Sequence, residues 1–137
     1  MVHSDLDHHG FTSALIGFAR DNGAAAYIGE GDDRWPAANS YDVGALYRLV
    51  AEKAPATGST FHGVGDLGIP FKVIAETIAG IETKSITQAE APQFLGFLAG
   101  FAGLDNPVSN DTTQEVLGWQ PSHPGWVEDV RTGHYID

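Results

Sequence analysis

Tyr27-Ile-Gly-Glu-Gly-Asp-Asp-Arg-Trp-Pro36 is the stretch that decides the fold, because an apolar segment ends there and a polar, glycine-containing one begins. Residues 24–28, which lead into it, are short and apolar and predict a β-strand. Residues 29–33 predict a loop, and Trp35-Pro36 extends this loop because the residue before a proline is pushed out of the helical region. The stretch therefore predicts a strand followed by a long turn.

Helices are predicted on both sides of that turn. Two apolar stripes recur at helical spacing, namely Phe11, Ala14, Leu15 and Phe18, and then Val43, Leu46, Tyr47 and Val50. Asn22-Gly23 marks the end of the first helix, which we expect over about residues 11–21. Ser40 is a good N-cap for the second helix, and Asp42 in its first turn complements the helix dipole. The second helix should end near Ala54-Pro55.

The remaining chain continues the alternation of strands and helices. Strands are predicted over residues 59–64 and 84–87, a helix is expected to start at Pro70, and an apolar, glycine-interrupted helix is expected over 94–101. Thr112 and Glu115 match a capping box before a helix that stops at Gly118, and the tail from Gln120 should be irregular. The predicted fold class is α/β, or α+β as an isolated piece. We expect residues 1–137 to form a single domain.

Composition and charge restrict the classes of partner. The 137 residues carry 18 acidic and 7 basic side chains, a formal net charge of -11, and no Cys. Such a field repels phosphate backbones and anionic lipid surfaces, so neither nucleic acid nor a membrane is an expected partner. Disulfides and thiolate chemistry are excluded. The polar start resembles no signal peptide, and we expect a cytoplasmic protein.

One glycine pattern could suggest a nucleotide site. Gly63-Val-Gly-Asp-Leu-Gly68 has the spacing of a dinucleotide fingerprint and lies between a predicted strand and a predicted helix. However, Pro70 predicts that the helix begins after the glycines, and the half-polar residues 59–62 do not resemble a buried first strand. We therefore favour a turn in which the glycines supply unusual backbone angles.

Other chemical candidates are weaker. Five possible metal ligands lie between His3 and His9, but the calcium-loop spacing fails, and a frayed, exposed terminus is the preferred interpretation, with adventitious nickel or zinc binding left open. The acidic pair at positions 32 and 33, and Asp42 with His62, are nominated as acid–base pairs, with surface charge as the default. No metal site is predicted.

Four segments in sequence order resemble parts of the extended short-chain dehydrogenases, the NAD-dependent epimerase/dehydratase family. These are residues 27–50, Phe61-His-Gly-Val64, Ile69-Pro-Phe-Lys-Val-Ile-Ala-Glu76, and Leu117-Gly-Trp-Gln-Pro-Ser-His-Pro124, which is similar to the family's Leu-Gly-Trp-x-Pro signature. The resemblance covers nearly the whole chain. It implies the carboxyl-terminal, substrate-side part of a family whose amino-terminal Rossmann domain binds NAD or NADP and carries a Tyr-x-x-x-Lys pair.

The resemblance implies substrate recognition for four residues. Val2-His3 resembles the strand-end loop that lies close to the nicotinamide in the family, and Arg34, Trp35 and Asn39 match positions lining the substrate side. An arginine could pair with a phosphate or carboxylate, and a tryptophan could stack on a ring. Equally, Trp35 could pack under the loop while Arg34 is solvated. The chain reads Asn39-Ser-Tyr-Asp42 where the family commonly has His-Val-Asp-Asp, so only the second acidic position remains.

The sequence therefore predicts the substrate-binding half of an NAD(P)-dependent oxidoreductase for a carbonyl or sugar-like substrate. No Tyr is followed four residues later by Lys, so we expect no catalytic residue, no NAD binding and no activity in this chain alone. The alternative is a stand-alone, non-catalytic binding or assembly module. In that case the exposed apolar surface would be covered by a homo-oligomer rather than by an amino-terminal Rossmann half.

Overall fold

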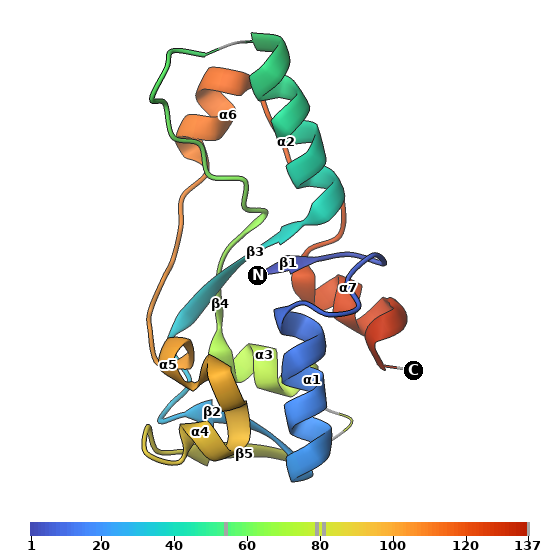
Figure 1. The fold of residues 1–137 in the computed structure, drawn as a ribbon, viewed down its shortest axis with the longest axis vertical. Coiled ribbons are helices and arrows are strands. Elements are labelled where there is room, and N and C mark those ends of the chain that lie inside the picture. Colours follow the sequence, from blue (N-terminus) through green and yellow to red (C-terminus); the bar gives the residue numbers. More distant parts are fainter. Residues whose placement is uncertain (54, 79, 81, 137) are drawn as a thin grey trace.

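The computed structural model describes residues 1–53, 55–78, 80 and 82–136. Its strands form two small sheets (Figure 1). One has the order β1-β3-β4, with β1 (Val2–His3), β3 (Arg34–Asn39) and β4 (Asp66–Pro70). The other pairs β2 (Ala24–Ile28) with β5 (Glu82–Ile86) in parallel. The mixed α/β class predicted from the sequence is confirmed.

Helices surround these sheets and give the molecule a long shape (Figure 1). The α-helices are α1 (Phe11–Asn22), α2 (Ser40–Lys53), α3 (Phe71–Thr77), α4 (Ala91–Leu95), α5 (Ala99–Ala102), α6 (Asp111–Leu117) and α7 (Trp126–Thr132). Two 3-10 turns, η1 (Gly96–Leu98) and η2 (His134–Ile136), complete the order. The helices α2 and α6 lie at one end of the molecule, and β2, β5 and α4 lie at the other.

Two hydrophobic cores hold these ends. The larger joins α1, β2, α3, α4 and α7, with Ile74, Leu98 and Trp126 fully buried. The smaller packs Leu46 of α2 against Leu117, the last residue of α6, and against Trp119, which follows that helix. The helix expected after Pro70 is α3, and its Phe71, Ile74 and Ala75, with Ile78 just beyond it, are all buried. Helix α1 instead buries Thr12, Leu15, Ile16 and Ala19, which shifts its inner face from the predicted stripe.

The predicted loop at Trp35-Pro36 is wrong, because both residues belong to β3. A proline cannot donate to a sheet ladder, and it is tolerated here by an irregularity: the pairing with β4 shifts register between Trp35 and Ala37. The Pro36 carbonyl accepts a hydrogen bond from the amino group of Met1. Strand β3 can therefore lie between β1 and β4 although Pro36 has no amide N–H to donate.

The strand predicted over residues 59–64 is also wrong. This segment is irregular, and side chains of the α6 region bind its backbone: the Thr113 hydroxyl bonds both the amide and the carbonyl of His62, each at 2.9 Å. Asn110 donates to the Val64 carbonyl at 2.7 Å. A strand forms further along the chain, over 66–70, and α3 begins at Phe71, as the position of Pro70 predicted.

Several predicted ends differ in detail. The Asn39 side chain, rather than Ser40, accepts from the Tyr41 amide at 3.1 Å at the start of α2. The capping box predicted for Thr112 and Glu115 does not form, because α6 already begins at Asp111 and Thr112 lies inside its first turn; among the described residues no side-chain hydrogen bond of the N-cap residue caps this helix. The tail is not wholly irregular, since it contains α7 and η2. Residue 54, at the predicted end of the second helix, lies outside the described residues.

Candidate functional site

The carboxyl ends of two parallel strands bring His3 and Asn39 together. In the β1–β3 pairing Val2 lies opposite Ala38 and His3 opposite Asn39. Side chains alternate along a strand, so His3 and Asn39 share one face of the sheet and Val2 and Ala38 share the other. This pairing contradicts the frayed terminus predicted from the sequence, because His3 and the following serine are almost completely buried.

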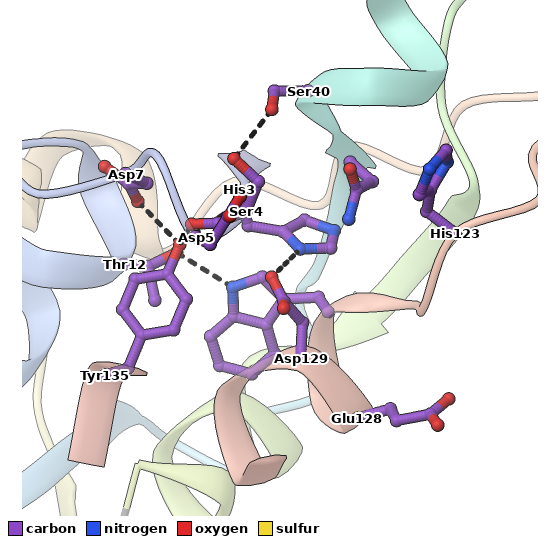
Figure 2. A network of polar contacts seen from close by, with 12 residues as sticks. His3, Ser4, Asp5, Asp7, Thr12, Ser40, His123, Glu128, Asp129 and Tyr135 are labelled. Atoms are coloured by element: carbon purple, nitrogen blue, oxygen red, sulfur yellow. Dashed lines mark hydrogen bonds and ion pairs between the residues drawn. The ribbon is translucent and has the colours of Figure 1, made fainter. Parts of the chain in front are cut away.

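Asp129 of α7 holds the imidazole of His3. The His3 Nδ1 lies 2.6 Å from Asp129 Oδ2, and the second ring nitrogen, Nε2, is buried with no hydrogen-bond partner among the described residues. Figure 2 shows this second nitrogen on the side of the ring turned away from Asp129. A carboxylate on one ring nitrogen favours a proton there, so Nδ1 is the donor of this hydrogen bond.

A second carboxylate–histidine pair lies beside the first. Asp42 is buried, accepts from the amides of Ser122 and His123, and lies 2.7 Å from the His123 ring. Burial by itself raises the pKa of Asp42, but these hydrogen bonds outweigh it and hold the pKa below its usual value. The nominated partner His62 lies elsewhere, against the Ser109 carbonyl. A small pocket of about 120 Å³ is bordered by His3, Asn39, Asp42 and His123.

The amino-terminal segment is fixed by a further polar network (Figure 2). The Tyr135 hydroxyl donates to the Ser4 carbonyl at 3.1 Å and lies 3.0 Å from Asp7 Oδ2. Burial raises the pKa of the Tyr135 phenol, and the neighbouring Asp7 adds to the rise. In addition, the Trp126 indole donates to the Thr12 hydroxyl at 2.9 Å. Of the residues weighed as metal ligands, His3, Asp5 and Asp7 therefore serve as hydrogen-bonding groups in the fold.

The opposite face of the sheet carries an apolar groove of about 730 Å³. This apolar groove is lined by Met1, Val2, Gly10, Phe11, Pro36, Ala38, Val43, Leu46, Tyr47, Val50, Phe61, Gly63 and Val64. Val2 is 56 % exposed and Tyr47 is 75 % exposed. The stripe predicted for α2 thus faces this groove, and only Leu46 of that stripe is buried.

A second concavity continues the groove, and we call it the aromatic hollow. It measures about 410 Å³ and is lined by Met1, Phe11, Trp35, Pro36, Phe101, Leu104, Asp105 and Asn106. It shares Met1, Phe11 and Pro36 with the apolar groove. Trp35 forms the floor: its side chain is buried, its Nε1 donates to the Phe101 carbonyl at 3.3 Å, and its ring packs edge-on against Phe71 at 5.0 Å.

Arg34 lies at the rim of this hollow and is already paired. Its Nε and Nη2 donate to the two carboxylate oxygens of Asp105 at 2.9 and 2.7 Å, and its backbone amide donates to the same carboxylate at 2.9 Å. The Arg34 guanidinium lowers the pKa of Asp105 to about 2. Of the four predicted substrate-side residues, the structure therefore brings His3 and Asn39 together on one face and places Arg34 and Trp35 apart from them.

The glycine pattern does not form a nucleotide cradle. Gly63 and Gly65 lie in the irregular segment before β4, and Gly68 lies within β4. None of the three has a positive φ, so the expected unusual backbone angles are wrong as well. Close packing explains them better: a Cβ on Gly63 would meet Leu46 at 2.7 Å and one on Gly68 would meet Arg34 at 3.2 Å. No strand-to-helix turn presents amides to a pyrophosphate here.

No group of three or more His, Cys, Asp or Glu side chains is placed to hold a metal ion in the described ranges. No helix within the same ranges has the length and apolar character needed to cross a bilayer.

Comparison with known sequences gives relatives that are longer than this chain. It is 40 % identical over 138 residues to an uncharacterized protein of Schizosaccharomyces pombe, covering 98 % of this chain and 46 % of the relative. It is 26 % identical over 126 residues to a 3-diazoavenalumate denitrifying reductase of a Streptomyces species, covering 83 % of this chain and 41 % of the reductase. The chain thus spans less than half the length of these curated relatives. No protein-family model matches the sequence.

Solved structures resemble the chain in fold. Pal from Bacillus thuringiensis matches with a TM-score of 0.67 and 17 % identity, over 98 % of this chain and 42 % of Pal. DesIV from Streptomyces venezuelae, a dTDP-glucose 4,6-dehydratase with NAD and TYD bound, matches with a TM-score of 0.56 and 16 % identity, over 85 % of this chain and 36 % of DesIV. RMD from Pseudomonas aeruginosa, complexed with NADPH, matches with a TM-score of 0.52 and 15 % identity, over 93 % of this chain and 43 % of RMD. The chain has the fold of an epimerase-type carboxyl-terminal region.

Three residues that hold His3, Asp42 and Asp7 were not predicted from the sequence. Asp129, His123 and Tyr135 all come from the tail that was expected to be irregular. A signal was available for the first of them, because Trp126, Val127 and Val130 recur at helical spacing after Gly125. No local pattern predicts that Asp129 reaches His3, which lies 126 positions earlier.

Proposed function

We propose that this chain is the substrate-side part of an NAD(P)-dependent oxidoreductase of the epimerase/dehydratase type, acting on a carbonyl or sugar-like compound. The observation that supports it most is the apolar groove, which leaves Val2, Phe11 and Tyr47 exposed on one concave face. Contiguous apolar surface of this kind marks a face that meets a partner or a ligand. Small-molecule sites form preferentially at the boundary between two such parts.

The partner proposed for the groove is an amino-terminal Rossmann half. Relatives more than twice as long contain residues that could form it. The residues that the structure describes form no glycine cradle for a dinucleotide, so we propose that the chain binds neither NAD nor NADP by itself. In such an enzyme the nicotinamide and the proton-transferring residues belong to the other half. The residues of this chain would then bind the substrate, orient it and exclude water from it.

The four predicted substrate-side residues receive different proposed roles. Trp35 would form a rigid wall of the substrate cavity, since it lines the aromatic hollow and is held by Phe101 and Phe71. His3 and Asn39 lie on the face opposite the groove, so they would position the β1–β3 edge and could contact only a small polar group in the 120 Å³ pocket. Arg34 would shape the rim through Asp105.

A chimera tests this function. The part of the S. pombe relative that this chain does not match would be fused ahead of Met1, and NADPH binding would be followed by calorimetry and by nicotinamide fluorescence. We expect the chimera to bind NADPH and to oxidise it when carbonyl compounds are added, whereas the chain alone gives no heat with NAD or NADP. Micromolar binding of either dinucleotide to the chain alone would contradict the proposal.

The same exposed groove also supports a second candidate, a stand-alone module that associates through this face without catalysis. Tyr47→Gln and Val2→Gln would make the groove polar while leaving the buried Leu46 in place. If the chain is such a module, sedimentation should show an oligomer that these changes dissociate. A monomer that is well behaved at all concentrations counts against the module.

A further inference from the structure

We propose that the aromatic hollow binds the neutral aromatic end of the substrate and rejects compounds that carry a phosphate or carboxylate there. The proposal rests on the proposed function for the reaction. Its account of the ligand class rests instead on the walls of the hollow, on its charges and on the way it joins the apolar groove. It therefore separates this chain's substrate from the nucleotide-linked sugars that the same fold can accept.

The walls of the hollow are apolar and partly preformed. Phe11, Phe101 and Leu104 are between 42 and 56 % exposed, and they lie around one concavity of about 410 Å³. This volume lies within the range of small-molecule sites. Trp35 at the floor is fixed by its bond to the Phe101 carbonyl and by its edge-on contact with Phe71. A fixed wall reduces the entropy lost when a ligand binds.

The arrangement of the rings favours an aromatic ligand over a saturated one. The centroids of Phe11 and Trp35 are 6.3 Å apart with their planes tilted by 47°, and Phe11 also contacts Phe97 at 6.0 Å. Aromatic rings prefer such tilted or edge-to-face contacts and gain more from them than their buried area alone provides. A planar ring entering beside Phe11 and Phe101 can extend this cluster by one member.

The charges at the hollow disfavour anions. Asp105 is the one charged side chain in its lining, and the nearby Arg34 guanidinium is occupied by both oxygens of that carboxylate. The Met1 amino group, which also borders the hollow, donates to the Pro36 carbonyl. Among the described residues the lining holds no cationic side chain, so an anionic ligand would face the Asp105 carboxylate and the chain's net charge of -11.

The hollow opens into the apolar groove through the wall that the two share, formed by Met1, Phe11 and Pro36. A ligand whose ring lies over Trp35 can therefore extend its other end along the groove. Under the proposed function, that end carries the carbonyl and points to where the cofactor half would lie. The hollow then selects the ring, and the groove accommodates the rest of the substrate.

Four small probes test the ligand class on the isotope-labelled chain. Acetophenone and cyclohexyl methyl ketone share a methyl ketone and differ in ring character, benzoate keeps the aromatic ring but adds a negative charge, and thymidine diphosphate supplies phosphates. We expect acetophenone to shift the Trp35 indole resonance and to bind about two- to tenfold more tightly than the cyclohexyl ketone. Benzoate and thymidine diphosphate should leave that resonance unchanged. Equal binding of the two ketones, or tighter binding of either anion, would overturn the proposal.

Three variants sharpen this test. Phe101→Ala removes an exposed ring from the hollow and should weaken acetophenone binding about two- to tenfold, whereas Val116→Ala on α6, where Val116 is exposed to the same extent as Phe101, should not. Asp105→Asn releases the Arg34 guanidinium and should let benzoate shift the Trp35 resonance. If Phe101→Ala binds as the unaltered chain does, the hollow is not the site.

The outcomes distinguish this proposal from the proposed function. Acetophenone binding at Trp35 without NADPH binding by the chimera would retain the hollow and reject the oxidoreductase. An active chimera whose KM for an aromatic ketone is unchanged by Phe101→Ala would retain the oxidoreductase and reject the hollow.

Discussion

His3 and Asp129 form a hydrogen bond of 2.6 Å, which joins the last residue of β1 to the first turn of α7. His3 is 1 % exposed, so the imidazole has little access to water as an alternative partner. Hydrogen bonds to a charged group contribute more than neutral ones, and a buried group that loses its partner incurs the full desolvation cost. This contact should therefore be an important link between the two ends of the chain.

Removing the carboxylate tests that link. Asp129→Ala should lower the free energy of unfolding by about 2–3 kcal/mol, and Asp129→Asn by about 1 kcal/mol because an amide oxygen can still accept from Nδ1. Urea titrations followed by tryptophan fluorescence give both values. Glu128→Gln is the matched control, since Glu128 is exposed in the same helical turn and points away from His3 (Figure 2). Equal effects at positions 128 and 129 would contradict this account.

The hydrogen bond between Trp126 and Thr12 should be stabilising for a related reason. Both side chains are fully buried, and Thr12→Val keeps the volume while removing the acceptor at 2.9 Å. The indole N–H is then buried without a partner, which should cost about 1–3 kcal/mol in urea unfolding. Thr132→Val, on the exposed side of α7, should change stability by less than about 0.5 kcal/mol.

Acid should weaken the fold through Asp42. Its pKa is lower in the folded chain than in the unfolded one, so its contribution is complete above the unfolded value and is lost as the pH falls through the folded value. Unfolding measured from about pH 6 to pH 3 should therefore show stability declining towards acid. Asp42→Asn should flatten this decline. His123→Ala should give an intermediate slope, because the two main-chain donors to Asp42 remain.

Two glycine substitutions should have opposite effects. Gly31 has a φ of 73°, and an added Cβ would lie 2.6 Å from the Cβ of Lys72, so Gly31→Ala should destabilise the chain by at least about 1–2 kcal/mol. Gly17 is exposed in the interior of α1 with no atom near the added Cβ, and Gly17→Ala should stabilise the chain by about 0.5–1 kcal/mol. Thermal and urea unfolding together measure both. Destabilisation by Gly17→Ala would contradict the open surface seen there.

Much of the secondary structure follows from local patterns in the sequence. The helices α1, α2 and α3 and the strand β2 lie where apolar spacing, Gly23 and Pro70 predict them. These signals are local because a helix buries residues three and four apart. The strand over 59–64 was mispredicted because its backbone groups bond to Asn110 and Thr113, about fifty positions later in the chain. Side-chain partners at that distance leave no local trace.

The sequence by itself determined the mixed α/β class, the approximate helices and the acidic surface, since each depends on composition or short-range spacing. Only the tertiary structure decided that His3 and Asn39 face away from the groove, that Arg34 is neutralised by Asp105, and that Trp35 forms the floor of a hollow. Each of these depends on strand register, and a shift of one residue moves every side chain to the other face. Register here is set by the β1–β3 pairing and the irregularity at Pro36, which join segments more than thirty positions apart.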